Sequence, residues 1–395
     1  MKDKYESNIW KYYLYEFFMN LWFILPISVI FLREMGIKYG QIGLLEFTVS
    51  FSVILFEIPT GVFSDFIGKK IALFFGSLFW TIAMVMIGLS STFPLFLIGF
   101  LVWGLADSLM SGTKSAMVYD TLKALKRKKS YLSVRGKSRL IIAVSTIIAS
   151  LSGTLLYEID SRLPWVFFGV SAFIASFFIL SCKEPYKKNS GYTMSNQIGH
   201  IKESMNFVFS QRTIRWIVFY SALIILPFTI FNNIIKQPYI ISIGFQVISL
   251  GWIIAFIYGI SGIFSMFSER IEKHLGEKGS FIVISLVHGL GFMMLGLYNI
   301  MPMLALISLI FLSRAYKDNV IEFYINNHTS SDKRSTVLSI QNLVVNVTGA
   351  VYVLVGGVLL DILKMNHVLI GMGVITLILS IGYIMFGYPK AHASG

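Results

Sequence analysis

The sequence predicts an all-α integral membrane protein of twelve transmembrane helices, arranged as two pseudo-symmetric six-helix bundles with both termini in the cytoplasm. The first observation is composition: 55% of the 395 residues are hydrophobic, 13% are charged, and the mean hydropathy is +0.72. A soluble domain cannot bury that much apolar surface, so the bilayer must act as its solvent. The second observation is an internal repeat, and the third is the distribution of basic residues.

Apolar runs long enough to cross a bilayer, about 20 residues each, occur twelve times along the chain. Their unbroken length favours helices over the shorter strands of a β-barrel. We place the spans at approximately 12–32, 40–62, 71–91, 94–118, 139–157, 164–182, 214–235, 247–268, 280–298, 302–325, 337–360 and 367–388. The first run is full length and lacks a small-residue cleavage site, so we expect no cleaved signal peptide.

The basic residues report topology. With the N-terminus inside, most of the 33 Lys and Arg fall in cytoplasmic segments. The outer loops then contain Arg33, Lys38, Arg162, Lys236 and Lys364. This is the positive-inside distribution, so the net charge of +13 does not indicate a nucleic-acid partner. The single cysteine, Cys182, excludes an internal disulfide and a cysteine-based metal cluster.

The internal repeat predicts two halves. Ile24-Leu25-Pro26 recurs 201 positions later as Ile225-Leu226-Pro227, and Gly61 recurs as Gly262 at the same offset. We therefore expect a bundle at 1–182, a cytoplasmic linker at 183–213 with an amphipathic surface helix at 195–209, and a second bundle at 214–395. Parallel halves of six helices are typical of transporters whose substrate site lies near the bilayer midplane.

The stretch from Glu57 to Lys70 reads EIPTGVFSDFIGKK. It resembles the loop signature between the second and third helices of the major facilitator superfamily. The residues at the signature spacing G-x-x-x-D-x-x-G-K-K are Gly61, Asp65, Gly68, Lys69 and Lys70. Gly61 would permit a close helix approach and Gly68 a tight turn, and Asp65 can form an ion pair or cap a helix start.

Two further stretches, SGTKSAMVYDTLK and YINNHTSSDKRSTVLSIQ, resemble a branch of the same superfamily. The resemblance covers nearly the whole chain and implies transport by alternating access. One departure concerns the fifth helix, IIAVSTIIASLSGTLLYEI, which lacks the proline of the G-x-x-x-G-P-x-x-G-G pattern common in drug–proton antiporters. That departure weakens the case for a drug exporter.

Four predicted helices carry charges that are costly at the bilayer centre. Residues three or four apart share a helix face, which gives the sets Tyr12, Glu16, Asn20 and Phe23; Glu46, Ser50, Val53 and Glu57; Asp107, Ser111, Lys114 and Val118; and Arg314, Asp318 and Glu322. The resemblance implies that these helices line or flank the transport cavity.

For each charge a functional and a structural explanation stay open. Glu16, Glu46 and Asp107 are candidates for proton coupling, because a carboxyl group can be protonated when desolvated and charged when hydrated. Glu46 can instead snorkel. Glu57 suits a gate or helix packing more than substrate contact.

The basic intramembrane residues suggest paired roles. Arg314 and Asp318 can simply neutralise each other, and the repeat sets Lys114 opposite Glu322, which would allow salt bridges across the halves. Asp120, together with Asp65, Lys69 and Lys70, is a candidate cytoplasmic latch.

Polar and aromatic side chains are candidates for the substrate cavity, although packing is the commoner role of an aromatic residue in a membrane helix. They are Tyr12, Asn20, Phe23, Asn232, Tyr258, Tyr316, Asn342 and Asn346, with Met110 and Phe228 as apolar wall. No P-loop or metal-ligand motif is present in the sequence. Only His288 of the six histidines lies in the interior of a span, where we expect it to be packed.

These features predict proton-driven export of small amphipathic compounds, drugs among them, by a monomer in the cytoplasmic membrane of a prokaryote. The partners are the bilayer and a small-molecule substrate, with the proton gradient in place of a cofactor. The acidic, aromatic cavity suits cationic or zwitterionic compounds, since a phosphate carrier would need more than Lys114, Arg314 and Lys317. One alternative is a carrier, exporter or importer, of a specific metabolite, peptide or siderophore. A remote one is a membrane sensor or enzyme on the same scaffold.

Overall fold

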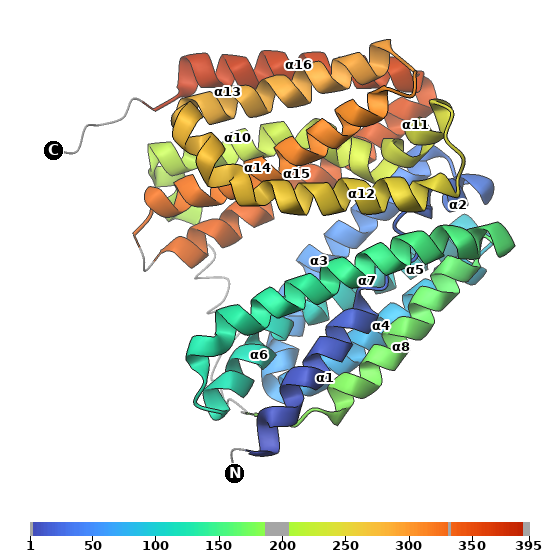
Figure 1. Cartoon of the computed structure of the whole chain (residues 1–395), viewed down its shortest axis with the longest axis vertical. Helices are drawn as coiled ribbons and strands as arrows, with labels where there is room; N and C mark the ends of the chain where they lie inside the picture. The colour runs from blue at the N-terminus through green and yellow to red at the C-terminus, as the bar shows by residue number, and fades with distance from the viewer. Residues whose placement is uncertain (1–2, 186–204, 331–332, 390–395) are drawn as a thin grey trace. The chain divides into compact units, whose positions relative to one another are not determined.

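A computed structural model describes residues 3–185, 205–330 and 333–389, and every regular element in these residues is helical (Figure 1). The α-helices are α1 (Asp3–Met19), α2 (Ser28–Glu34), α3 (Tyr39–Ile67), α4 (Lys69–Leu89), α5 (Phe93–Met110), α6 (Thr113–Ala124), α7 (Tyr131–Ile159), α8 (Leu163–Ser181), α10 (Arg212–Ile230), α11 (Lys236–Ser242), α12 (Ser249–Phe264), α13 (Ser268–Leu297), α14 (Met303–Asn327), α15 (Arg334–Ile362) and α16 (Met365–Gly387). A π-helical turn, Phe231–Ile235, joins α10 to α11.

The chain forms two compact units. Unit 1 comprises Met1–Ile37, Leu45–Gln197 and Val247–Ala255, and unit 2 comprises the segments Lys38–Leu44, Ile198–Gln246 and Phe256–Gly395. The first residues of α3 therefore pack with unit 2, and those of α12 pack with unit 1. The surface helix expected at 195–209 falls largely outside the described residues, and the boundaries 1–182, 183–213 and 214–395 stay predictions.

Among the described residues, nine helical segments are long and apolar enough to cross a membrane. One of them, Ser249–Leu297, contains both α12 and α13, whereas α1 and α14, which carry charged side chains, are not among the nine. The all-helical membrane fold is thus confirmed, while the count of twelve spans and the cytoplasmic termini stay predictions.

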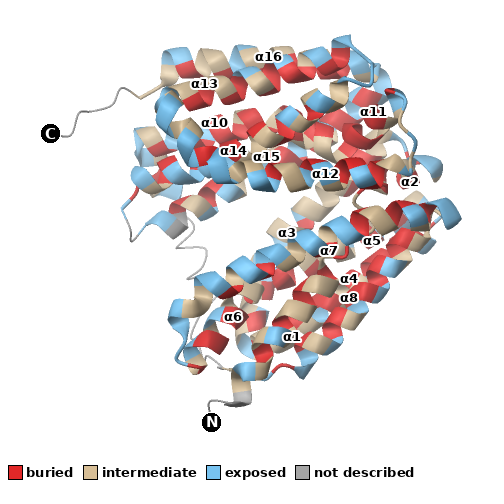
Figure 2. Ribbon diagram, in the orientation of Figure 1, coloured by how far each residue is buried: buried red, intermediate tan, exposed pale blue. Residues whose placement is uncertain are grey.

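Unit 1 is built around α4, which packs against α5 and α8, and α8 in turn packs against α1. Large aromatic side chains fill its core: Trp80 is 2% exposed and Trp165 and Phe168 are fully buried. Figure 2 shows this buried strip along α4 and α8. A Cβ atom at Gly88 would lie 2.7 Å from the Trp165 side chain, so only glycine allows the two helices to meet here.

Unit 2 has two principal helix pairs, α13 with α16 and α10 with α15. Helices α13 and α16 lie side by side (Figure 1), and a Cβ atom at Gly373 would lie 2.5 Å from the Gly289 carbonyl oxygen. Trp216 stacks between Tyr220 and Tyr383, with ring centroids 5.5 and 5.3 Å away. Small residues thus bring the backbones together and aromatic residues fill the remaining space.

Two predicted spans are interrupted. The span expected at 12–32 breaks after Met19, where the Asn20 amide donates to the Glu16 carbonyl (2.7 Å) and Pro26 lacks an amide hydrogen. The span expected at 94–118 divides at Gly112, whose φ of 68° turns the chain between α5 and α6.

The helix that contains the span expected at 214–235 extends beyond residue 235. The helix continues through the π-helical turn and α11 to Ser242, so Lys236 lies in a helical segment, is 2% exposed, and is not an outer-loop residue. The apolar run is followed by the charge of Lys236 and by Pro238, but proline is tolerated in the first turn of a helix, and Pro238 lies in the first turn of α11.

Candidate functional site

The face of α1 predicted from spacing carries a hydrogen-bonded carboxylate. Tyr12 donates its hydroxyl to Glu16 Oε1 (2.5 Å), and Asn20 donates its amide to Glu16 Oε2 (3.1 Å). Arg135 of α7 donates to the Tyr12 hydroxyl oxygen (3.0 Å). Glu16 is 3% exposed, so two neutral donors stabilise a buried charge. Arg135 is linked to it through the Tyr12 hydroxyl group.

Asp107 of α5 is held in a similar way. Trp80 of α4 donates its indole N–H to Oδ1 (2.8 Å), and Trp103 donates to Oδ2 (2.9 Å). Lys114 lies beyond the Gly112 turn, and its ammonium faces the Tyr15 ring, 5.7 Å from the centroid. In the described part of the chain Asp107 has no ion pair.

Glu46 lies partly buried in the portion of α3 that belongs to unit 1. Within the described ranges the structure records neither a hydrogen bond nor an ion pair for its carboxylate. The three candidates for proton coupling, Glu16, Glu46 and Asp107, thus all lie in unit 1 and lack a direct cation partner among the described residues.

The charged ladder of α14 differs from the predicted one. Asp318 lies 2.9 Å from Arg314 Nε, though not in hydrogen-bond alignment, and 2.8 Å from Lys317 Nζ. Glu322 is exposed and forms no ion pair within the described residues. Lys317 replaces Glu322 as the third member because a lysine side chain reaches the neighbouring residue, whereas Glu322 would bring a second negative charge to Asp318.

The signature loop is stabilised from two sides within unit 1. Lys69 forms an ion pair with Asp120 of α6, and the backbone N–H groups of Lys69 and Lys70 donate to the Glu184 carboxylate (3.2 and 2.8 Å). Gly68 has a φ of 99°, which agrees with the predicted tight turn. The latch predicted between Lys69 and Asp120 is therefore present as a contact, and its role in transport is untested.

Two expectations about this loop are wrong. Glu184, not Asp65, caps the start of α4, because the chain after α8 brings the Glu184 carboxylate to these amides. Gly61 permits no close approach, since a Cβ atom there would meet nothing within 4 Å. Glu57, on the same end of α3, is exposed.

The predicted cavity residues separate into different environments. Asn342 and Asn346 share an exposed face of α15. Tyr316 is a correction: it is 3% exposed in the core of unit 2, where its hydroxyl pairs with Ser280 (2.7 Å). Met110 is also buried, with its sulfur accepting from the Tyr15 hydroxyl (3.3 Å), and Phe23 packs on Phe167.

Three predicted residues of unit 2 do meet. Asn232, Tyr258 and Phe228 surround two residues that we did not select, Lys236 and Phe311. Lys236 Nζ donates to Asn232 Oδ1 (2.8 Å) and lies over the Tyr258 and Phe311 rings, 5.4 and 5.5 Å from their centroids. The four-residue spacing of Asn232 and Lys236 is the sequence feature that could have revealed their contact, because residues four apart share a helix face. Phe311 belongs to another helix, so spacing along the chain could not reveal it.

His288 is buried, as expected, with Nδ1 2.9 Å from the Ile284 carbonyl oxygen. Its ring lies beside Phe228. In the described residues no group of three His, Cys, Asp or Glu side chains is arranged to hold a metal ion.

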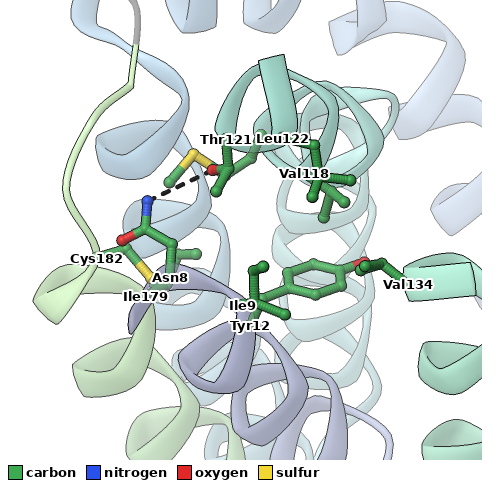
Figure 3. A pocket seen from close by; sticks show the side chains of 10 residues that line it. Asn8, Ile9, Tyr12, Val118, Thr121, Leu122, Val134, Ile179 and Cys182 are labelled. Atoms are coloured by element: carbon green, nitrogen blue, oxygen red, sulfur yellow. Dashed lines mark hydrogen bonds between the residues drawn. The ribbon is translucent and has the colours of Figure 1, made fainter. Parts of the chain in front are cut away.

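Figure 3 shows a small cavity in unit 1, lined by residues that include Asn8, Tyr12, Thr121 and Cys182. Its volume of about 10 Å³ suits a single water molecule, and Asn8 hydrogen-bonds Thr121 across it. A cleft of about 590 Å³ lies in unit 2 beside the turn from α12 to α13 and is lined partly by Glu269, Glu272 and Asn319. Only the second is large enough for a small organic molecule.

Comparison with known proteins places the chain in a family. Residues 17–316 match the model of the Major Facilitator Superfamily. An uncharacterised MFS-type transporter, YxaM of Bacillus subtilis (strain 168), is 24% identical over 68% of this chain and 67% of its own length. The quinolone resistance protein NorA of Staphylococcus aureus is 20% identical over 41% of this chain, and the match spans only 42% of NorA.

Solved structures agree on the fold. A point mutant of the nucleoside transporter NupG superposes with a TM-score of 0.83 and 13% identity over 96% of this chain and 99% of that one. A D-xylose–proton symporter gives a TM-score of 0.74 at 13% identity over 97% and 98% of the two chains. The family model covers well over half of the chain, and these related proteins are transporters and not enzymes. The chain belongs to the major facilitator superfamily and is a multi-pass secondary transporter.

Proposed function

We propose that this transporter is a proton-coupled exporter of small amphipathic compounds in the cytoplasmic membrane of a prokaryote. The observation that carries the proposal is the environment of Glu16, a buried carboxylate held by the neutral donors Tyr12 and Asn20. A direct cation partner would keep such a group ionised. No such partner is among the described contacts of Glu16, which makes this carboxylate our candidate for the coupling group.

The contacts around Glu16 also suggest how a proton is linked to movement. The Tyr12 hydroxyl donates to Glu16 and accepts from Arg135, so it connects α1 to α7. Protonation removes the negative charge to which Tyr12 donates and leaves the Arg135 charge less well compensated. The link between α1 and α7 is then weakened, and binding of a cationic substrate group would favour the deprotonated form.

The export of amphipathic compounds is supported by similarity and by composition. NorA, a quinolone resistance protein, is a relative over part of the chain. Aromatic residues and methionines are abundant, with 34 Phe, 19 Tyr and 17 Met, and such side chains can contact varied apolar groups.

The test is substrate flux in proteoliposomes with and without a proton gradient, using a panel of fluorescent cations and antibiotics. The variants are Glu16→Gln, Glu46→Gln and Asp107→Asn. Glu6→Gln is the matched control, because Glu6 lies in the same helix as Glu16 but is 58% exposed and paired with Arg127. We expect at least one of the three variants to reduce gradient-driven flux to the level without a gradient, while Glu6→Gln transports normally.

Normal gradient-driven flux in all three variants would show that these carboxylates are structural. Failure to move any compound of the panel would favour the second candidate, a carrier of one specific metabolite. The similarity in fold to a nucleoside transporter and to a D-xylose–proton symporter favours that candidate. A metabolite panel in a thermal-shift assay would then reveal a single stabilising ligand.

A further inference from the structure

Lys236 is a buried cation without an anionic partner in the described structure. It is 2% exposed, and its one recorded hydrogen bond goes to a neutral acceptor, Asn232 Oδ1, at 2.8 Å. An ammonium group has three donors, and a buried charge that is not compensated is costly. The other buried lysine of unit 2, Lys317, is compensated by Asp318 at 2.8 Å. Lys236 therefore differs from Lys317 in having no carboxylate partner among the described residues.

Aromatic rings surround this ammonium. Nζ lies 5.4 Å from the Tyr258 centroid and 5.5 Å from that of Phe311, both within cation–π range. Phe311 packs on Phe228 (5.0 Å), and the Arg314 guanidinium covers the Phe228 ring at 4.8 Å. The cluster is thus apolar on its walls and positively charged at both ends.

The cluster reaches the surface of unit 2 at Tyr258. This side chain is 37% exposed, and its hydroxyl lies 3.4 Å from the Asn232 oxygen that also accepts from Lys236. A ligand that moves Tyr258 aside meets the ammonium next. The π-helical turn Phe231–Ile235, which contains Asn232 and ends directly before Lys236, is a type of irregularity that is frequent at functional sites.

We propose that Lys236 binds the carboxylate of the transported compound, while Tyr258 and Phe311 contact its apolar or aromatic part. Asn232 orients the ammonium through its side-chain oxygen. This inference rests on the proposed export of amphipathic compounds and narrows them to organic acids and zwitterions. A carboxylate is favoured over a phosphate because its single negative charge matches the one ammonium group. A phosphate group carries about −1.5 to −2 charges and would call for a second cation, but Arg314 is already engaged by Asp318 and Phe228.

Binding to the purified, full-length protein in detergent tests this assignment without any gradient. The probes are naphthylacetate and its neutral analogue naphthylacetamide, which differ only in having a carboxylate or a carboxamide group. Titration calorimetry would compare wild type with Lys236→Gln, Lys236→Arg and Asn232→Ala. Lys364→Gln is the control, because Lys364 is an exposed lysine of the same unit.

We expect wild type and Lys364→Gln to bind the acid at least about tenfold more tightly than the amide, which corresponds to ~1.4 kcal/mol. Lys236→Gln should bind the two probes equally, Lys236→Arg should keep part of the preference, and Asn232→Ala should weaken it. A thermal unfolding curve like that of wild type would show that Lys236→Gln is folded. If Lys236→Gln does not fold, the assignment is tested by Lys236→Arg and Asn232→Ala, which should both show a smaller preference for the acid than wild type.

Equal binding of both probes by wild type, no binding of naphthylacetate, or a preference that survives in Lys236→Gln would each overturn the assignment. The result is separable from the proposed function. Gradient-independent flux together with a Lys236-dependent acid preference would refute proton coupling and leave the anion site standing. Proton-coupled flux without that preference would support proton coupling and refute the anion site.

Discussion

The carboxylate of Asp107 accepts hydrogen bonds from two indole N–H groups. The contribution of each bond to the stability of the folded protein can be measured separately. Replacing Trp103 by Phe keeps an aromatic ring but removes the donor to Oδ2. A hydrogen bond to a charged group contributes about 1.5–3 kcal/mol, so we expect Trp103→Phe to lower the free energy of unfolding by about that much. Chemical denaturation in detergent measures it, with Trp252→Phe, a 69% exposed tryptophan, as control. An equal effect of both substitutions would contradict the assigned hydrogen bond.

His328 provides a test of pH dependence outside the membrane spans. Its Nε2 lies 3.4 Å from Glu277, and this carboxylate raises the pKa of His328 above its usual 6.5. Because the folded state binds the proton more tightly, the pair stabilises unit 2 fully below about pH 6.5 and loses that contribution as pH rises through the raised pKa.

The melting temperature of wild type should therefore fall relative to that of Glu277→Gln as pH increases from about 6 to 8. A difference between the two proteins that is constant over this range would show that the His328–Glu277 contact contributes nothing in solution.

Single residues also show how far spacing predicts a site. The i, i+4 rule correctly put Tyr12, Glu16 and Asn20 on one face of α1, because that geometry belongs to one helix. Arg135 and Trp80 reach their partners from other helices, and helix rotation about its axis is not readable from one sequence. Lys236 lies inside a helical segment and not in an outer loop, although the apolar run before it ends at Ile235.

At the scale of elements, the start of α3 is fixed by α15 within unit 2. The Asp361 carboxylate accepts from the backbone N–H groups of Tyr39 (2.9 Å) and Gly40 (2.8 Å). A Cβ atom at Gly357 would lie 2.4 Å from the Tyr39 carbonyl oxygen, so the backbones are in close contact. Asp361 thus serves as a helix cap supplied from a distant segment.

Loss of this cap should be measurable. Asp361→Ala is expected to destabilise the protein by about 1 kcal/mol, and Asp361→Asn by less, because the amide keeps one acceptor oxygen. Thermal unfolding in detergent compares them with Glu158→Ala, an exposed carboxylate near the end of α7. If Asp361→Ala behaves like the control, the cap contributes no net stability.

Element boundaries were predicted well where hydropathy changes abruptly and poorly where the backbone is irregular. The span expected at 164–182 corresponds closely to α8, Leu163–Ser181. The break after Met19, the turn at Gly112 and the π-helical turn at Phe231–Ile235 were not predicted. Such irregularities depend on side-chain hydrogen bonds and packing, so an apolar run alone does not reveal them.

In the molecule as a whole, each unit holds intramembrane charges that lack an ion-pair partner among the described residues. Among the described residues, unit 1 holds Glu16, Glu46 and Asp107 without direct cation partners, and unit 2 holds Lys236 without an anionic one. Composition and hydropathy predicted the fold class because the bilayer imposes them on every span. The substrate was not predictable, since it depends on contacts between side chains from different helices.

The most direct test of the central claim is proton release on substrate binding, measured with a pH-sensitive dye in weakly buffered solutions of the purified protein. Coupling through a carboxyl group requires that a compound transported by wild type displaces a proton. We expect proton release from wild type and from Glu6→Gln. One of the variants should release no proton, because it lacks the coupling group; the variants are Glu16→Gln, Glu46→Gln and Asp107→Asn. Unchanged release from all three variants, or binding to wild type without any release, would contradict it.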